Sequence, residues 1–433
     1  MYNKNNKLTI FSWSLYDFAN QPFTTLVVTF IYGAFFTKFI VADEILGTAL
    51  WSRAITISSL IVAFLSPIMG AIADNGGYRK SFFIFWTWIC IVFTFLLFFP
   101  ISGDIIMALT YFIIANVGFE MGGVFCNSYL PDIASSRKIG RISGYGWSFG
   151  YVGGLIALVI SFVLLINTST PIFGFNIENG ENIRATNILI SIWFAIFSIP
   201  SFLFLKDNII QKKFNISVIN NSFLSIKKTF VELKKYKNIF RFLIARLFYN
   251  DGLITIFAFG GIYASNTFNF SFNEIFLFGI LLNLCAGVGA FILGYVDDYI
   301  GGKKTIQLSN LGLIVACIIA TVVPNENINL LILTVHGKNL FWFSGILIGL
   351  FSGPNQSASR SLMARLIPKG KENEFFGFFA FSGKATAFIG PLFLGLFTQI
   401  FNSQRVGIVI VIILFGIGSF LLTRVSEVEN ANI

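Results

Sequence analysis

Apolar stretches long enough to cross a lipid bilayer follow one another along almost the whole chain. Hydrophobic residues make up 55% of its 433 residues and charged residues only 12%, more apolar surface than a soluble fold can bury. Because a spanning helix needs about 20 mainly apolar residues, the sequence predicts an all-α membrane protein with twelve transmembrane helices. The windows cover residues 9–38, 49–73, 81–100, 104–129, 141–166, 186–205, 239–263, 273–296, 305–323, 339–358, 375–399 and 406–423.

A short motif occurs twice, each time between two of the predicted helices. It starts with Gly and continues with Asp at +4, Gly at +7 and two cations at +9 and +10. Glycine allows the tight turn between two antiparallel helices, and a repeat at matching places indicates two related halves. We refer to the two copies as the signature loops. They are Gly70, Asp74, Gly77, Arg79 and Lys80, and Gly294, Asp298, Gly301, Lys303 and Lys304.

The repeat also predicts the domain organisation. Residues 1–206 are expected to form an N-terminal bundle of six helices and residues 238–433 a C-terminal bundle of six. Residues 207–237, the one extended polar stretch, are expected to be a basic cytoplasmic linker. Its Phe223, Ile226, Phe230 and Leu233 recur at helical spacing opposite pairs of lysines, a pattern that resembles a helix lying on an anionic leaflet.

The net charge of +10 follows from topology rather than from a nucleic-acid site. Of the 30 Lys and Arg residues, 23 fall on the side of the predicted helices that also holds both termini. An excess of cations on one side marks the cytoplasmic face of a membrane protein. We therefore expect cytoplasmic termini, a multi-pass protein of the bacterial inner membrane, and no nucleic-acid partner.

The residues of cofactor and metal chemistry are scarce. All four cysteines fall inside predicted helices, without the close spacing of a metal site, and the chain has a single histidine. A phosphate-binding loop of the GxxxxGK[ST] type does not occur in the sequence, so an ion gradient is the expected driving force. We expect no cofactor and no enzymatic activity, because a membrane enzyme would need a catalytic set that the sequence does not offer.

Polar side chains form a stripe on the first and on the fourth predicted helix. Asp17 and Asn20 share one face of helix 1, and Asn116 and Glu120 share one face of helix 4. A carboxylate in contact with lipid costs several kcal/mol, so these residues are expected to face a wet cavity or another helix. Two interpretations stay open for each carboxylate: binding of substrate or a coupling proton, or a structural bond between helices.

The second half carries polar residues on its corresponding helices. Helix 7 has two ionisable residues five positions apart, which do not face each other well, so each is expected to meet another helix. Helix 10 has an amide and a guanidinium on one face, and helix 11 has a lysine at depth. Structural pairing and ligand or coupling roles stay open. The candidates are Arg246, Asn250, Asp251, Gln356, Arg360 and Lys384.

The signature loops resemble the loops at matching places in the two halves of the major facilitator superfamily. Four further segments resemble its Atg22-like branch, whose eukaryotic members are vacuolar effluxers, and they are residues 13–20, 249–252, 356–361 and 376–391. The resemblance implies two six-helix bundles, alternating access, a cavity lined by helices 1, 4, 7 and 10, and amino-acid export in the vacuolar members.

These observations lead to a functional hypothesis with alternatives. Charges of both signs in the candidate pocket favour a small zwitterionic, amino acid-like solute, moved with protons or, alternatively, with sodium. Trp13, Tyr16 and Tyr249 could instead stack on a sugar ring. A lipid or drug exporter, or a sensor or scaffold that keeps the fold without transporting, are further alternatives. A monomer is expected.

Overall fold

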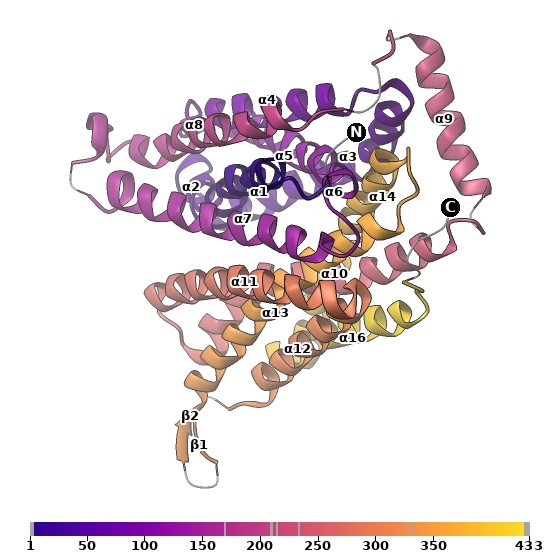
Figure 1. Ribbon diagram of the computed structural model, residues 1–433. Helices are drawn as coiled ribbons and strands as arrows, with labels where there is room; N and C mark the ends of the chain where they lie inside the picture. The colour runs from indigo at the N-terminus through magenta and orange to yellow at the C-terminus, as the bar shows by residue number, and fades with distance from the viewer. Residues whose placement is uncertain are drawn as a thin grey trace. The chain divides into compact units, whose positions relative to one another are not determined.

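The computed structural model describes residues 4–168, 170–207, 211–213, 215–232, 234–324, 326–330 and 333–427, and within these it is almost entirely helical (Figure 1). Eleven helical segments of the described chain are long and apolar enough to cross a membrane. The helix α13 (Gly337–Leu366) is also long enough but carries many buried polar residues. With α13 as the twelfth, the described helices confirm the predicted all-α membrane fold.

The chain divides into two compact units, which we describe separately. Unit 1 comprises Met1–Ser135, Phe149–Lys228 and Pro368–Phe381, and unit 2 comprises Ser136–Ser148, Thr229–Ile367 and Ser382–Ile433. The two units do not coincide with the two halves of the sequence, because each unit includes a short segment from the other half of the chain. The division into bundles of residues 1–206 and 238–433 stays a prediction.

Unit 1 is built from the helices of the first half. Its elements are α1 (Lys7–Pro22), η1 (Phe23–Phe30), α2 (Tyr32–Phe35), η2 (Phe36–Ile40), α3 (Glu44–Gly76), α4 (Arg79–Leu96), α5 (Ile105–Asn127), α6 (Leu130–Ile133), most of α7 (Ile139–Ser161), η3 (Phe162–Ile166), η4 (Ile172–Gly174), α8 (Glu181–Phe204), most of α9 (Ile216–Val231) and the start of α14 (Glu372–Lys384). The first spanning segment is continuous from Lys7 to Ile40 and widens to π-type turns after Pro22, where the proline removes one backbone donor.

Bulky aromatic residues and glycines hold unit 1 together. The indole N–H of Trp13 donates to the carbonyl of Cys126 at 2.8 Å, which ties α1 to α5. The α4 and α8 helices lie side by side (Figure 1). Where α7 crosses α1, a methyl group added to Gly153 would lie 2.3 Å from the carbonyl oxygen of Phe18. Only glycine allows that close approach of the two backbones.

Unit 2 contains the helices of the second half. Its elements are the first turns of α7, the end of α9, α10 (Lys237–Phe268), α11 (Phe272–Ile300), α12 (Gly302–Val322), the strands β1 (Asn327–Leu330) and β2 (Leu333–His336), α13, the end of α14, α15 (Ile389–Phe401) and α16 (Gln404–Thr423). The strands form one antiparallel hairpin, in which Asn327 pairs with His336.

The eleventh predicted helix is interrupted, whereas the sequence pattern predicted one continuous helix over 375–399. It consists of α14, which ends at Lys384, and α15, which begins at Ile389. Pro391 explains the position of the break. Its nitrogen has no hydrogen to donate to the carbonyl of Ala387, and its ring clashes with that carbonyl. In the first turn of a new helix, by contrast, proline is well tolerated.

Candidate functional site

Both signature loops turn on a glycine with a left-handed backbone. Gly77 has φ +73° between α3 and α4, and Gly301 has φ +92° between α11 and α12. A residue with a Cβ atom is strained at such angles. The glycines of the motif therefore make the predicted turns.

The aspartate of the first loop caps a helix from the other half of the chain. Asp74 accepts hydrogen bonds from the backbone N–H of Asn373 at 3.2 Å and of Glu374 at 2.8 Å, in the first turn of α14. It also accepts one from the Asn373 amide at 2.7 Å. A carboxylate at a helix N-terminus pairs with unsatisfied N–H groups and with the positive end of the helix dipole.

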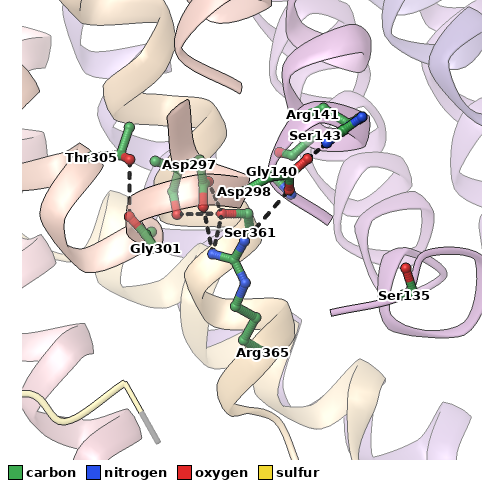
Figure 2. Close-up of polar contacts among 12 residues, drawn as sticks. Ser135, Gly140, Arg141, Ser143, Asp297, Asp298, Gly301, Thr305, Ser361 and Arg365 are labelled. Atoms are coloured by element: carbon green, nitrogen blue, oxygen red, sulfur yellow. Dashed lines mark hydrogen bonds and ion pairs between the residues drawn. The ribbon is translucent and has the colours of Figure 1, made fainter. Parts of the chain in front are cut away.

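Asp298 in the second loop has the same role. It accepts a hydrogen bond from the backbone N–H of Gly140 at 2.8 Å and one from the Arg141 guanidinium, in the first turn of α7 (Figure 2). Gly70 and Gly294, which open the two loops, lie where the capped helices approach closely. A methyl group on Gly70 would lie 2.2 Å from the Asn373 carbonyl oxygen.

Arg79 organises a buried polar network in unit 1. Its guanidinium pairs with Asp132 at 2.7 Å and with Asp207 at 3.1 Å, and it lies 4.0 Å above the ring of Tyr129. Asp207 also accepts a hydrogen bond from the backbone N–H of Lys80 at 2.9 Å. Both cations of the first loop therefore lie at the start of α4 with Asp207.

An equivalent network occupies unit 2. Glu427 accepts hydrogen bonds from the backbone N–H of Gly302 at 2.8 Å and of Lys303 at 3.1 Å, at the start of α12. Arg365 pairs with Glu427 at 3.2 Å. It also pairs with Asp297 at 2.5 Å, and Asp297 accepts a hydrogen bond from Ser361 (Figure 2). The ammonium of Lys303 donates to the carbonyls of Thr423 and Val425 at 2.8 and 2.7 Å, and Lys304 is exposed.

Five residues of these networks were missed by the sequence analysis. They are Asp132, Asp207, Asp297, Arg365 and Glu427. A signal for two of them exists in the sequence. Asp207 and Glu427 each follow, by about one helical turn, the last spanning helix of one half. That repeated position marks them as counterparts.

Arg360 contacts the start of α7. Its guanidinium donates to the hydroxyl of Ser143 at 2.9 Å and to the Ser143 carbonyl at 2.7 Å, and it lies 5.7 Å from the ring of Trp147. The side chain is only 3% exposed. These contacts favour a structural role for Arg360 over contact with a solute, and its neighbour on the same helix, Gln356, is half-buried.

The interrupted helix 11 is flanked by polar side chains of α10. Arg246 donates to the hydroxyl of Ser382 at 2.9 Å, and the Asn250 amide donates to the carbonyl of Gly383 at 3.1 Å, both at the carboxyl end of α14. Lys384, half-buried, is the last residue of the same helix. Cations and amide donors thus gather where the helix dipole is negative.

Asp251, next to Asn250, meets the other side of the break. Its carboxylate accepts a hydrogen bond from the backbone N–H of Gly390 at 2.8 Å, in the first turn of α15. The side chain is 1% exposed, and its second oxygen has no hydrogen-bond partner among the described residues. As expected from their spacing, Arg246 and Asp251 meet different segments.

Unit 1 contains the other predicted residues. The Asn116 amide donates to the hydroxyl of Ser58 at 2.8 Å, which joins α5 to α3 and favours its structural interpretation. Asp17 and Glu120 are half-buried, and Asn20 is buried. Gly150 of α7 lies beside Asp17, since a methyl group added there would lie 3.5 Å from the Asp17 Cβ atom.

The aromatic residues that the sequence offered for sugar stacking are fully enclosed by protein. Trp13 and Tyr16 are 0% exposed and Tyr249 is 1% exposed. The hydroxyl of Tyr16 is bonded to Thr87 at 2.9 Å and that of Tyr249 to Ser359 at 2.8 Å. Their rings therefore pack in the core of each unit.

The fold matches that of solved transporters. Against a variant of the E. coli fucose:proton symporter FucP, the TM-score is 0.71 over 97% of this chain and 98% of the other, at 13% sequence identity. At that identity the likeness establishes the fold alone. The chain therefore has the fold of major facilitator superfamily transporters.

Sequence comparison identifies the branch of the superfamily. The family described as "Vacuole effluxer Atg22 like" matches residues 40–432, so the chain belongs to the Atg22-like family. The MFS-type transporter YxiO of Bacillus subtilis (strain 168) is 26% identical over 98% of this chain and 96% of its own length. Autophagy-related protein 22 of Cryptococcus neoformans is 26% identical over 67% of this chain but only 53% of its own length.

Proposed function

We propose that this transporter moves a small zwitterionic, amino acid-like solute by alternating access and couples the movement to protons. The observation that carries the proposal is the set of donors on α10 and α14: the buried Arg246, Asn250, and Lys384 at the end of the same α14 helix. A cation in a spanning segment marks a ligand or ion site by default. An arginine fork suits a carboxylate in particular.

The acidic candidates support the second half of the proposal. Asp17 and Glu120 belong to unit 1 and are half-buried in spanning helices. Carboxylates in such surroundings bind an ammonium group or carry a proton. A zwitterion offers an opposite charge to each kind of side chain, whereas a neutral sugar offers no charge to either. The enclosed rings of Trp13 and Tyr16 also argue against a sugar.

The same proposal includes the orientation of the chain. The cation excess supports cytoplasmic termini in a bacterial inner membrane. The signature loops and their networks would then lie on the cytoplasmic side. A monomer suffices, since each chain carries all the candidates.

Transport assays in proteoliposomes test the proposal. The purified chain is reconstituted and offered radiolabelled amino acids, sugars and a fluorescent lipid, each with and without an inward proton gradient. Saturable, gradient-driven uptake of an amino acid is the expected result. Uptake of a sugar or lipid without any amino acid would contradict it, as would saturable binding without flux.

A further inference from the structure

The linker helix α9 presents two different sides, and one of them packs on unit 1. Ser222 donates to the carbonyl of Ala71 at 3.3 Å, and Ser225 donates to the Glu374 carboxylate at 2.9 Å. Val218, one turn before Ser222, packs against Ile72 and Tyr78. Small residues at helical spacing thus fix this side of α9 to the end of α3 and the start of α14.

The opposite side of α9 consists mainly of large apolar residues that are about half exposed or more, and among them the Phe230 ring also contacts the Phe240 ring of α10 at 6.0 Å. Phe223 is 52% exposed, Leu224 61% and Phe230 49%. A spacing of seven residues brings Phe223 and Phe230 to one side, and Ile216 and Val231 extend this surface, which we call the outer face, to both helix ends. Exposed apolar side chains gathered in this way mark an interaction surface.

Lysines lie within the outer face rather than opposite to it. Lys227 and Lys228 are exposed, and the helical positions place Lys227 between Phe223 and Leu224 on one side and Phe230 and Val231 on the other. The predicted arrangement, with lysines and phenylalanines on opposite sides of the helix, is wrong for Lys227. Leu233, the last apolar residue of the predicted pattern, lies outside the described residues.

The position of α9 in the chain keeps it beside the bilayer. The spanning helices α8, which ends at Phe204, and α10, which begins at Lys237, precede and follow it. Figure 1 shows α9 running crosswise to α4 and α8, as a helix lying along a membrane surface does. Residues 206–237 carry eight lysines against Asp207 and Glu232, and Asp207 is already paired with Arg79.

We propose that the outer face of α9 docks on anionic phospholipids of the bilayer that the chain spans. Its apolar side chains enter the boundary between headgroups and acyl chains, and its lysines meet the negatively charged phosphates. Lys227 distinguishes lipid from a protein partner. In a protein interface its charge would be buried among phenylalanines, whereas at a bilayer the long side chain reaches the headgroups.

The test uses the full chain and needs no substrate. An NBD fluorophore is attached to the cysteine of the Leu224→Cys variant. Cys285 is replaced by Ser so that it does not take up the label, because it is half-buried whereas the other three cysteines are buried. The protein is reconstituted in vesicles of phosphatidylcholine, with or without about 30 mol% phosphatidylglycerol. A nitroxide on the lipid chain near the headgroup reports insertion, and iodide in the buffer reports contact with water.

We expect about twofold stronger nitroxide quenching in the anionic vesicles, with weaker iodide quenching. Lys227→Gln with Lys228→Gln should return quenching to the level of neutral vesicles. The control pair Lys7→Gln with Lys369→Gln removes two exposed lysines outside α9 and should leave quenching unchanged. Backbone hydrogen exchange of α9 in the unsubstituted protein, in the same two vesicles, should show matching protection by phosphatidylglycerol.

Three results would overturn the proposal. Equal iodide quenching in both vesicles without nitroxide quenching would leave the outer face in water. Nitroxide quenching that does not respond to phosphatidylglycerol would remove the role of the lysines. Quenching that changes with the ratio of protein to lipid would indicate a second copy of the chain as the occupant.

Discussion

Asp74 accepts a hydrogen bond at 2.8 Å from the backbone N–H of Glu374, which lies 300 residues further along the chain. Asp298 accepts one, also at 2.8 Å, from the backbone N–H of Gly140, which precedes it by 158 residues. The aspartate of each signature loop therefore caps the fifth spanning helix of the other half. A short loop between two neighbouring helices thus makes contacts with residues 158 and 300 positions away in the sequence.

Replacing Asp74 by Asn should loosen the start of α14. The amide keeps the size of the side chain but loses the charge that favours a helix N-terminus, an effect of about 0.3–1 kcal/mol. We expect backbone hydrogen exchange to speed up by about two- to fivefold around Asn373 and Glu374, the two residues whose N–H groups Asp74 holds. Asp298→Asn serves as the control, since it should affect Gly140 instead. Unchanged exchange at 373–374 would refute the cap.

The single variant Arg79→Ala should be less stable than the double variant Arg79→Ala with Asp207→Asn. Arg79→Ala leaves Asp132 and Asp207 without their cation, a loss of about 3–5 kcal/mol for a buried pair. Adding Asp207→Asn to Arg79→Ala should restore about 0.5–3 kcal/mol, because the two residues interact directly. Thermal unfolding in detergent measures both effects. Strictly additive losses would show that the pair is not coupled.

Substitutions of Asp251 separate its structural role from proton coupling. Asn retains an acceptor for the Gly390 N–H, so Asp251→Asn should leave the melting temperature almost unchanged. Asp251→Ala removes the acceptor and should cost about 1–3 kcal/mol of stability. If Asp251 carries a coupling proton, Asp251→Asn abolishes gradient-driven accumulation while stability is retained. Full accumulation by Asp251→Asn would exclude the coupling role.

Arg246→Lys and Arg246→Gln should weaken solute binding in that order. Lysine keeps the positive charge but not the two-pronged donor geometry of arginine, and glutamine keeps neither. We expect KM for the transported solute to rise about tenfold in Arg246→Lys and further in Arg246→Gln. The matched control is Ser382→Ala, which removes the hydroxyl that accepts a hydrogen bond from Arg246 at 2.9 Å and leaves the guanidinium in place. Equal KM values in all variants would place the solute elsewhere.

The apolar pattern of the sequence was sufficient to predict the spanning helices, because their length is set by the bilayer rather than by particular contacts. The break in helix 11 was not predicted. Pro391 and Gly390 are visible in the sequence, yet a membrane helix often continues through such residues when neighbouring groups satisfy its backbone. Here Asp251 and Asn250 of α10 satisfy the free groups on the two sides of the break.

The candidate site was only partly accessible from sequence. Helical spacing identified Asp17, Glu120, Arg246 and Asp251 as ionisable residues in apolar segments, and all four lie in spanning helices. Spacing cannot identify partners from distant segments. The pairing of Arg79 with Asp207 and of Arg365 with Asp297 depends on helices brought together only by folding.

The most direct test of the account is proton movement in the lumen of proteoliposomes when the transported solute is added outside. A pH-sensitive dye enclosed in the vesicles should report acidification that requires an amino acid and saturates with its concentration. Asp17→Asn should reduce the signal at least about tenfold, if this carboxylate carries the proton or binds the ammonium group. Solute uptake that leaves the lumenal pH constant, or a full signal in both Asp17→Asn and Asp251→Asn, would contradict the account.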